Sequence, residues 1–107
     1  MAYEPSYDQK IGFSAAAAAT TALVAATSGA RTSVQGLRMT AGGTVVVTIK
    51  SGTNVLEIFN LVAGVPLVLP LRTKPYMRTN KGEALNITLG AAIQVDAQFE
   101  VITAPAD

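Results

Sequence analysis

Apolar and polar residues alternate without a break from Ile93 to Val101. The odd positions carry Ile, Val, Ala, Phe and Val, and the even positions carry Gln, Asp, Gln and Glu. Successive side chains of a β-strand point to opposite faces of a sheet, so this alternation is typical of a strand with one buried face. No helix can sort such a pattern onto one side. The segment therefore predicts a half-buried strand.

Other segments repeat this alternation between turn residues. We predict a long strand over 31–40, a β-branched strand over 44–50 and a short strand over 85–89. Residues 55–61 have apolar side chains on both faces, which is compatible with a strand covered on both sides. About seven or eight short antiparallel strands at roughly ten-residue spacing predict an all-β fold, a small β-sandwich or jelly roll.

Glycine residues mark two special positions in this pattern. Gly36 interrupts the strand over 31–40, which predicts a β-bulge. The sequence Ala41-Gly42-Gly43 predicts a hairpin turn of the kind that needs positive φ.

The first part of the chain lacks the strand pattern. We expect residues 1–21 to form an N-terminal arm, and residues 22–107 to form one β-sandwich domain. The arm contains Tyr3, Pro5 and Tyr7 but few aliphatic residues. Two alternatives stay open: a frayed terminus, or an arm that becomes ordered on a partner, with the two tyrosines as anchors.

An alanine-rich stretch over 13–26 resembles a targeting segment only superficially. It is too short and too rich in Thr to span a bilayer. Glu4 and Asp8 outnumber Lys10 in the segment before it, which is unlike a signal peptide. We expect a protein that is neither exported nor embedded in a membrane.

The composition predicts self-association. Charged residues make up 14% of the 107 residues and hydrophobic residues 50%, whereas about 25% charged residues are usual. A domain this small has much surface for its volume, so we expect part of that surface to be covered by other copies. Val65, Leu67, Leu69 and Leu71 form one apolar face of a segment whose prolines place it at a sheet edge or in a subunit contact. We take these four residues as the candidate subunit interface.

The residue types present leave little room for catalysis. The chain has no His and no Cys, so triads, thiolate chemistry and the commonest metal ligands are excluded. Asp96 and Glu100 lie on the same face of one strand, but that face is the solvated one. We therefore expect no enzyme, no metal and no cofactor. The net charge of +1 also gives no general attraction to nucleic acid or to an anionic membrane.

The strongest candidate contact site is a basic segment over 72–81. Its candidate contact residues are Arg72, Lys74, Tyr76, Arg78 and Lys81, and no acid interrupts them. Three interpretations stay open. The segment can bind phosphates with Tyr76 stacked on a base, it can dock onto an acidic protein surface, or it can be a solvated loop.

The order of strands and turns resembles that of a known group of virion proteins. The resemblance is carried by the segments 21–24, 29–31, 34–37, 44–53, 66–70 and 79–87. It is to head decoration (cement) proteins of tailed bacteriophages, and it covers about three quarters of the chain. Its motifs are signatures of strands and turns, and none of them is a signature of a site.

This resemblance implies a trimer of jelly-roll-like subunits seated on the outside of a capsid. The partner would be the major capsid protein, with the N-terminal arm (Tyr3, Pro5 and Tyr7) and the basic segment as means of attachment. It implies assembly in the host cytoplasm, without a small-molecule substrate, nucleic acid or membrane as partner. Similar sandwiches serve in tail fibres and host-binding tips, so a carbohydrate-binding module is the alternative.

Overall fold

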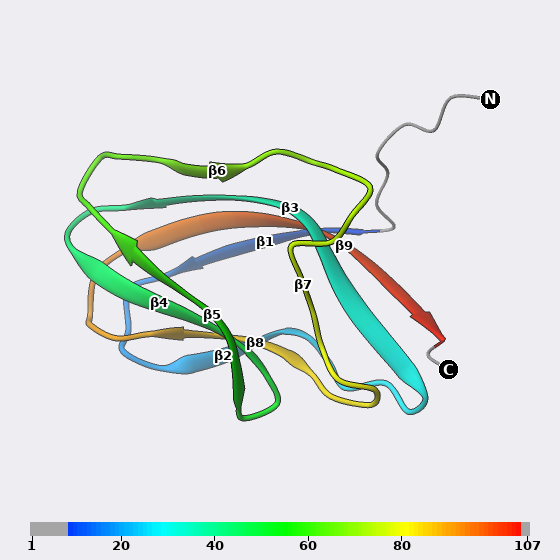
Figure 1. Cartoon of the computed structure of the whole chain (residues 1–107). Helices are drawn as coiled ribbons and strands as arrows, with labels where there is room; N and C mark the ends of the chain where they lie inside the picture. The colour runs from blue at the N-terminus through cyan, green and yellow to red at the C-terminus, as the bar shows by residue number, and fades with distance from the viewer. Residues whose placement is uncertain (1–8, 106–107) are drawn as a thin grey trace.

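The computed structural model describes residues 9–105, which contain nine β-strands and no helix. The strands are β1 (Gln9–Ala15), β2 (Thr20–Val24), β3 (Ala30–Ala41), β4 (Val45–Ser51), β5 (Asn54–Leu61), β6 (Leu67–Leu69), β7 (Met77–Arg78), β8 (Leu85–Leu89) and β9 (Val95–Pro105). They form two antiparallel sheets that lie face to face (Figure 1). The expected all-β sandwich is confirmed. No helix in the described range is long and apolar enough to cross a membrane.

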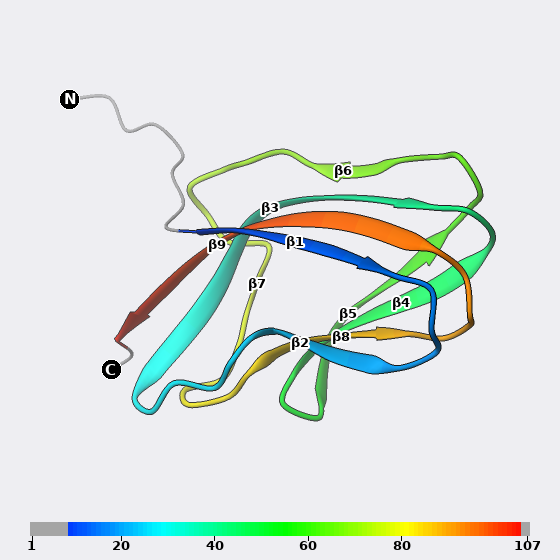
Figure 2. The same ribbon diagram turned by 180° about the vertical axis from the view of Figure 1, so that it is seen from behind.

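The two sheets have different strand orders. Sheet A has the order β1-β9-β3-β6, and β7 pairs with β3 beyond the end of β6. Sheet B has the order β2-β8-β4-β5. Figure 2 shows the two layers from behind, with β1 and β9 of sheet A in front and β2 and β8 of sheet B below them. Because the chain crosses repeatedly between layers, neighbouring strands come from distant parts of the sequence.

The core fills the space between the sheets, and the alternation along β9 is confirmed. Val95, Ala97, Phe99 and Val101 are buried, while the residues between them face outward. Facing them are apolar side chains of β4 and β8, which include Val47, Ile49, Leu85, Ile87 and Leu89. Burial of a large aliphatic or aromatic side chain stabilises a fold by about 1.5–3 kcal/mol, so this two-sided core dominates the stability.

The predicted bulge at Gly36 is confirmed. The pairing of β3 with β9 shifts between Val34 and Gly36, which leaves Gln35 as the extra residue. A Cβ atom on Gly36 would lie 3.0 Å from the Cα of Leu71, so a glycine allows the following chain to approach β3 closely.

The predicted hairpin at Ala41-Gly42-Gly43 is wrong. β3 belongs to sheet A and β4 to sheet B, so this turn carries the chain from one layer to the other. Neither Gly42 nor Gly43 has positive φ. The N–H of Gly42 donates to the carbonyl of Gln94 at 2.9 Å, which joins this corner to the segment that enters β9.

The expected extent of the N-terminal arm is also wrong. Residues 9–15 form β1, which pairs with β9 from Gln9 opposite Val101 to Ala15 opposite Val95. Ile11 and Phe13 pack against the core. An edge strand covers only one flank of the core, so two large apolar side chains are enough to hold it there. β2 then begins inside the range assigned to the arm. The part of the arm before Gln9 lies outside the described residues.

The strand over 55–61 is not covered on both sides. It is β5, the edge strand of sheet B, and its outward side chains are exposed. Val55 and Ile58 are among the exposed large hydrophobic residues, whereas Leu56 and Phe59 pack against the core.

Candidate functional site

The predicted basic contact segment is bound along β3, on the edge opposite β9, where its residues Met77–Arg78 pair with β3 as β7. We call residues 70–82 the strap. Its N–H groups at Arg72, Tyr76 and Thr79 donate to carbonyls of β3 at 3.0, 2.9 and 2.9 Å. The N–H of Gly82 also donates to the carbonyl of Ala30 at 2.7 Å, so four backbone hydrogen bonds on one strand hold the strap in place. Of the alternatives for this segment, a freely moving solvated loop therefore fits the structure least.

A buried side chain in β3 fixes the apex of the strap. Gln35 is 3% exposed, and its Nε2 donates to the carbonyls of Arg72 at 2.9 Å and Thr73 at 2.6 Å. Because Gln35 is buried, its amide needs these acceptors, and a buried donor without a partner costs about 1–3 kcal/mol. Gln35 was missed by sequence reasoning, although its place next to the predicted bulge at Gly36 was a usable signal.

Arg72 and Tyr76 are brought together at the outer surface of the strap. The guanidinium carbon of Arg72 lies 3.6 Å from the ring centroid of Tyr76, which is a cation–π stack. Nε of Arg72 donates to the carbonyl of Lys74 at 2.8 Å, and the Tyr76 hydroxyl donates to the carbonyl of Pro70 at 2.6 Å. One face of the Tyr76 ring is thus already occupied, which makes it a poor platform for a nucleic-acid base.

The remaining cations of the strap point to solvent. Lys74, Arg78 and Lys81 are exposed, and Arg78 lies in β7 opposite Ser33. The strap therefore presents a held backbone with several outward positive charges, as an interface with an acidic protein surface requires. Three of the predicted contact residues, Tyr3, Pro5 and Tyr7, lie outside the described residues.

The proposed subunit interface over 65–71 needs correction. Leu67 and Leu69 pair with β3 through β6 and pack against the core of their own subunit. Leu71 is half-buried, and only Val65, at 57% exposed, is freely accessible. Leu67 and Leu69 share one face of β6, as the alternation predicts, but that face is turned toward the subunit's own core. The predicted position of the segment at a sheet edge is confirmed.

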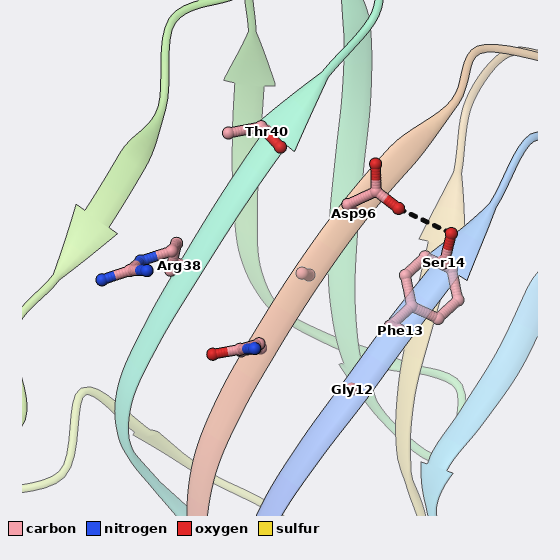
Figure 3. A pocket seen from close by; sticks show the side chains of 8 residues that line it. Gly12, Phe13, Ser14, Arg38, Thr40 and Asp96 are labelled. Carbon is pink, nitrogen blue, oxygen red and sulfur yellow. Dashed lines mark hydrogen bonds between the residues drawn. The ribbon is translucent and has the colours of Figure 1, made fainter.

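An open depression lies on the outer face of sheet A, across β1, β9 and β3 (Figure 3). Its volume is about 470 Å³, and it is lined by Gly12, Phe13, Ser14, Arg38, Thr40, Asp96, Ala97 and Gln98. Gly12 lies opposite Gln98 in the register, and its missing side chain opens the floor. Hydroxyl, amide, guanidinium and carboxylate groups here could bind a polar ligand by hydrogen bonds.

Asp96 is already engaged in this depression. Its Oδ1 accepts from the Ser14 hydroxyl at 2.6 Å, as Figure 3 shows, and from Nε2 of Gln94 at 3.1 Å. Glu100 lies four residues further along the same strand, so the two Cα atoms are about 13 Å apart. Paired-carboxylate hydrolysis of glycosides needs carboxyl groups roughly 5–9.5 Å apart. At their Cα atoms, the two residues are thus farther apart than the carboxyl groups of such a pair.

No metal centre is formed by the part of the chain that the structure describes. Over residues 9–105, no group of three or more His, Cys, Asp or Glu residues is placed to hold an ion. The side chains that are brought together here are suited to hydrogen bonding and charge recognition.

Comparison with known proteins gives likeness of fold only. No protein-family profile and no curated protein matches the chain. Among solved structures, PirA aligns with a TM-score of 0.49 and 10% identity over 92% of this chain and 96% of that one. A subunit of the disulfide-linked pili of Bacillus endospore appendages aligns with a TM-score of 0.42 and 13% identity over 92% and 91%. The sugar-binding C-terminal domain of EclA aligns with a TM-score of 0.44 and 14% identity over 97% and 82%. Likenesses at this level do not indicate what this chain binds.

Proposed function

We propose that this protein is a non-enzymatic structural subunit that binds a large protein assembly, as a trimeric decoration protein on the outer surface of a phage head. The observation that carries the proposal is the strap. Its cations Lys74, Arg78 and Lys81 are exposed on a backbone that is hydrogen-bonded to β3. A surface held in its binding conformation loses little entropy on docking.

The mechanism is attachment without chemistry. Each subunit would place its strap against acidic side chains of the capsid, and the subunits of one trimer would bind neighbouring capsid proteins together. Linked contacts raise the overall affinity far above that of a single contact. Because the trimer binds only the intact shell, its binding free energy adds to the stability of the shell.

Binding to heads that lack their outer proteins tests this proposal. Wild-type protein should cosediment with such heads and raise the temperature at which they break open. Arg78→Glu reverses one exposed charge of the strap and should weaken binding about tenfold or more, with most of the loss in the association rate. Arg38→Glu is the matched control, because it reverses an exposed charge away from the strap. No binding to heads, or equal losses in both variants, would refute the proposal.

The depression on sheet A favours a second candidate, a module that binds carbohydrate on a host surface. Arg38, Thr40 and Gln98 offer the polar groups that hydroxyl recognition needs, although Phe13 packs against the core and gives no free stacking platform. The same two variants separate the candidates. Glycan-array binding that is lost in Arg38→Glu and kept in Arg78→Glu would favour this second function.

A further inference from the structure

The outward face of sheet B carries almost no charge. The register of β2, β8, β4 and β5 places ten residues on it, which we call the sheet B face: Thr20, Ala22, Val46, Thr48, Lys50, Val55, Ile58, Asn60, Asn86 and Thr88. In Figure 1 these strands form the lower layer, so this face points away from sheet A. Lys50 is its one charged residue and is half-buried.

Large aliphatic side chains are concentrated on this face. Val46 is 43% exposed, Val55 54% and Ile58 51%. Val62 lies two residues beyond Asn60 and is also exposed, so the apolar row continues past the end of β5. Covering a Val or Ile completely is worth about 1.5–3 kcal/mol, so half-exposed ones leave a sizeable part of that free energy available for association.

The β5 edge of this sheet is protected against the addition of another strand, whereas the face of the sheet is uncovered. β5 is the edge strand, and Oε1 of Glu57 accepts the N–H of Ile58 at 3.2 Å. A strand that adds to this edge would have to displace that carboxylate and bury its charge, which is how natural sheets discourage edge-to-edge addition. Contact through the face, with the strands of two subunits packed against each other, carries no such cost.

We infer that a second copy of this chain packs on the sheet B face and covers Val46, Val55 and Ile58. The inference rests on the proposed function, which requires self-association, and it assigns the interface that Leu67, Leu69 and Leu71 do not provide. A face with so little charge offers nothing to an acidic or basic partner. Its complement is an equally uncharged surface, and each further copy of the chain carries one, so in the proposed trimer the sheet B faces of the subunits meet around the three-fold axis.

The sheet B face supplies about half of the area that a stable interface needs. Four strands spaced about 4.8 Å apart, with roughly six residues each, give a flat area of about 400 Å². A stable interface takes about 800 Å² from each partner. The adjoining Val62 and Val65 are exposed at the end of β5 and in the loop that follows, and they supply part of the remainder. The interface therefore extends over this loop.

Native mass spectrometry of Ile58→Lys tests the inference. The added charge faces outward, so the fold should persist while the oligomer dissociates at least about 100-fold more readily. Val68→Lys is the matched control, because Val68 is 49% exposed against 51% for Ile58 but pairs with Arg38 at the edge of sheet A. Its oligomer should match that of the wild type. An Ile58→Lys oligomer of wild-type mass, or equal dissociation of both variants, would overturn the inference.

Cysteine variants keep the test decisive if Ile58→Lys fails to fold. The chain has no Cys, so a single introduced thiol reports only on its own surroundings. Ile58→Cys should form an intersubunit disulfide on mild oxidation at low protein concentration, and Val68→Cys should not. The reverse result would overturn the inference.

Head binding is measured on the same samples and separates the two proposals. A monomeric wild type that still protects heads would refute the interface and leave head attachment standing. An oligomer that depends on Ile58 but never binds heads would support the interface and refute head attachment.

Discussion

The outer face of sheet A presents charged side chains and a hydrogen-bonded strap, whereas that of sheet B presents Thr, Asn and aliphatic side chains. On sheet A, Arg38 and Asp96 face solvent, and Lys74 and Arg78 extend from the strap beside it. On the outward rows of sheet B in the described range, Lys50 is the one charged residue. Both faces belong to the same sandwich and cover the same core.

The difference suggests a division of roles between the faces. Charged rims tune association rate and partner choice, whereas uncharged apolar surfaces provide the centre of lasting interfaces. A low overall content of charge therefore does not mean that the whole surface is sparsely charged. The strap, where we propose a foreign partner binds, carries exposed cations, and charge is depleted where we propose the chain binds itself.

The largest expected effect comes from the core that both faces share. Phe99 is fully buried in β9, so Phe99→Ala should lower the free energy of unfolding by about 3–5 kcal/mol. That is a large part of the roughly 5–15 kcal/mol typical of a domain. Urea denaturation at one fixed protein concentration measures the loss.

This variant should remove self-association and head binding together. Val68→Ala, at an exposed position, is the control and should change stability by no more than about 0.5 kcal/mol. A Phe99→Ala protein that unfolds at the wild-type urea concentration would mean that the two sheets do not share a core.

A smaller loss of stability is expected for Gln35→Ala, which should affect the strap but not the sheet B face. Gln35→Ala removes the two hydrogen bonds to the carbonyls of Arg72 and Thr73, each worth about 0.5–1.5 kcal/mol. Amide hydrogen exchange at Arg72 and Tyr76 should become faster, and head binding should weaken. The oligomer should persist, because the sheet B face is untouched.

Gln98→Ala is the control for this loss. Gln98 is exposed on β9, so its removal should leave stability and strap exchange close to wild type. If strap amides stay as protected in Gln35→Ala as in this control, Gln35 does not hold the strap.

The strands themselves could largely be predicted from the sequence. The alternation from Ile93 to Val101 marks β9, and Gly36 marks the bulge, because both signals are local. β1 was missed because Gln9–Ala15 contains only two large apolar side chains on its inward face. An edge strand needs no more than this, so a short edge strand and an arm have similar sequences.

The assignment of faces could not be predicted in the same way. Alternation tells which side chains share a face, but it does not tell whether that face meets the subunit's own core or a neighbour. Leu67 and Leu69 met the core, while Val55 and Ile58 did not. The turn at Gly42 likewise gave no local sign that the chain changes sheets there. Both outcomes depend on contacts between distant segments.

Lowering the pH should weaken the hydrogen bonds that join the strap to sheet B. The hydrogen bond from Ser51 is the main cause that lowers the pKa of Glu83 below its ordinary value, and the hydrogen bond from Asn80 lowers it further. Ser51 is buried in β4; its hydroxyl donates to Oε1 of Glu83 at 2.5 Å and accepts the N–H of Asn80 at 2.8 Å. The carboxylate therefore ties the end of the strap to β4.

The direction of the pH dependence follows from this lowered pKa. Stabilisation by the Glu83 carboxylate is fully present above the unfolded-state pKa of about 4.3, and it is lost as the pH falls through the lower folded-state pKa. Glu83→Gln should remove this contribution to acid sensitivity in melting temperatures measured from neutral pH downward. Ser51→Ala should reduce it, because it removes the main donor. An unchanged acid profile in both variants would mean that Glu83 does not couple the strap to sheet B.

The smallest expected effect distinguishes the two contacts of Tyr76. Tyr76→Phe removes the hydrogen bond to Pro70 but keeps the ring beneath Arg72, so it should cost about 0.5–1 kcal/mol. Head binding should change little, because the stack still positions the guanidinium. Tyr76→Leu removes the ring as well and should weaken head binding further at a similar stability. If the Tyr76→Phe and Tyr76→Leu variants bind heads equally, the stack does not orient Arg72 for its partner. Recognition by the strap then depends on its exposed cations alone.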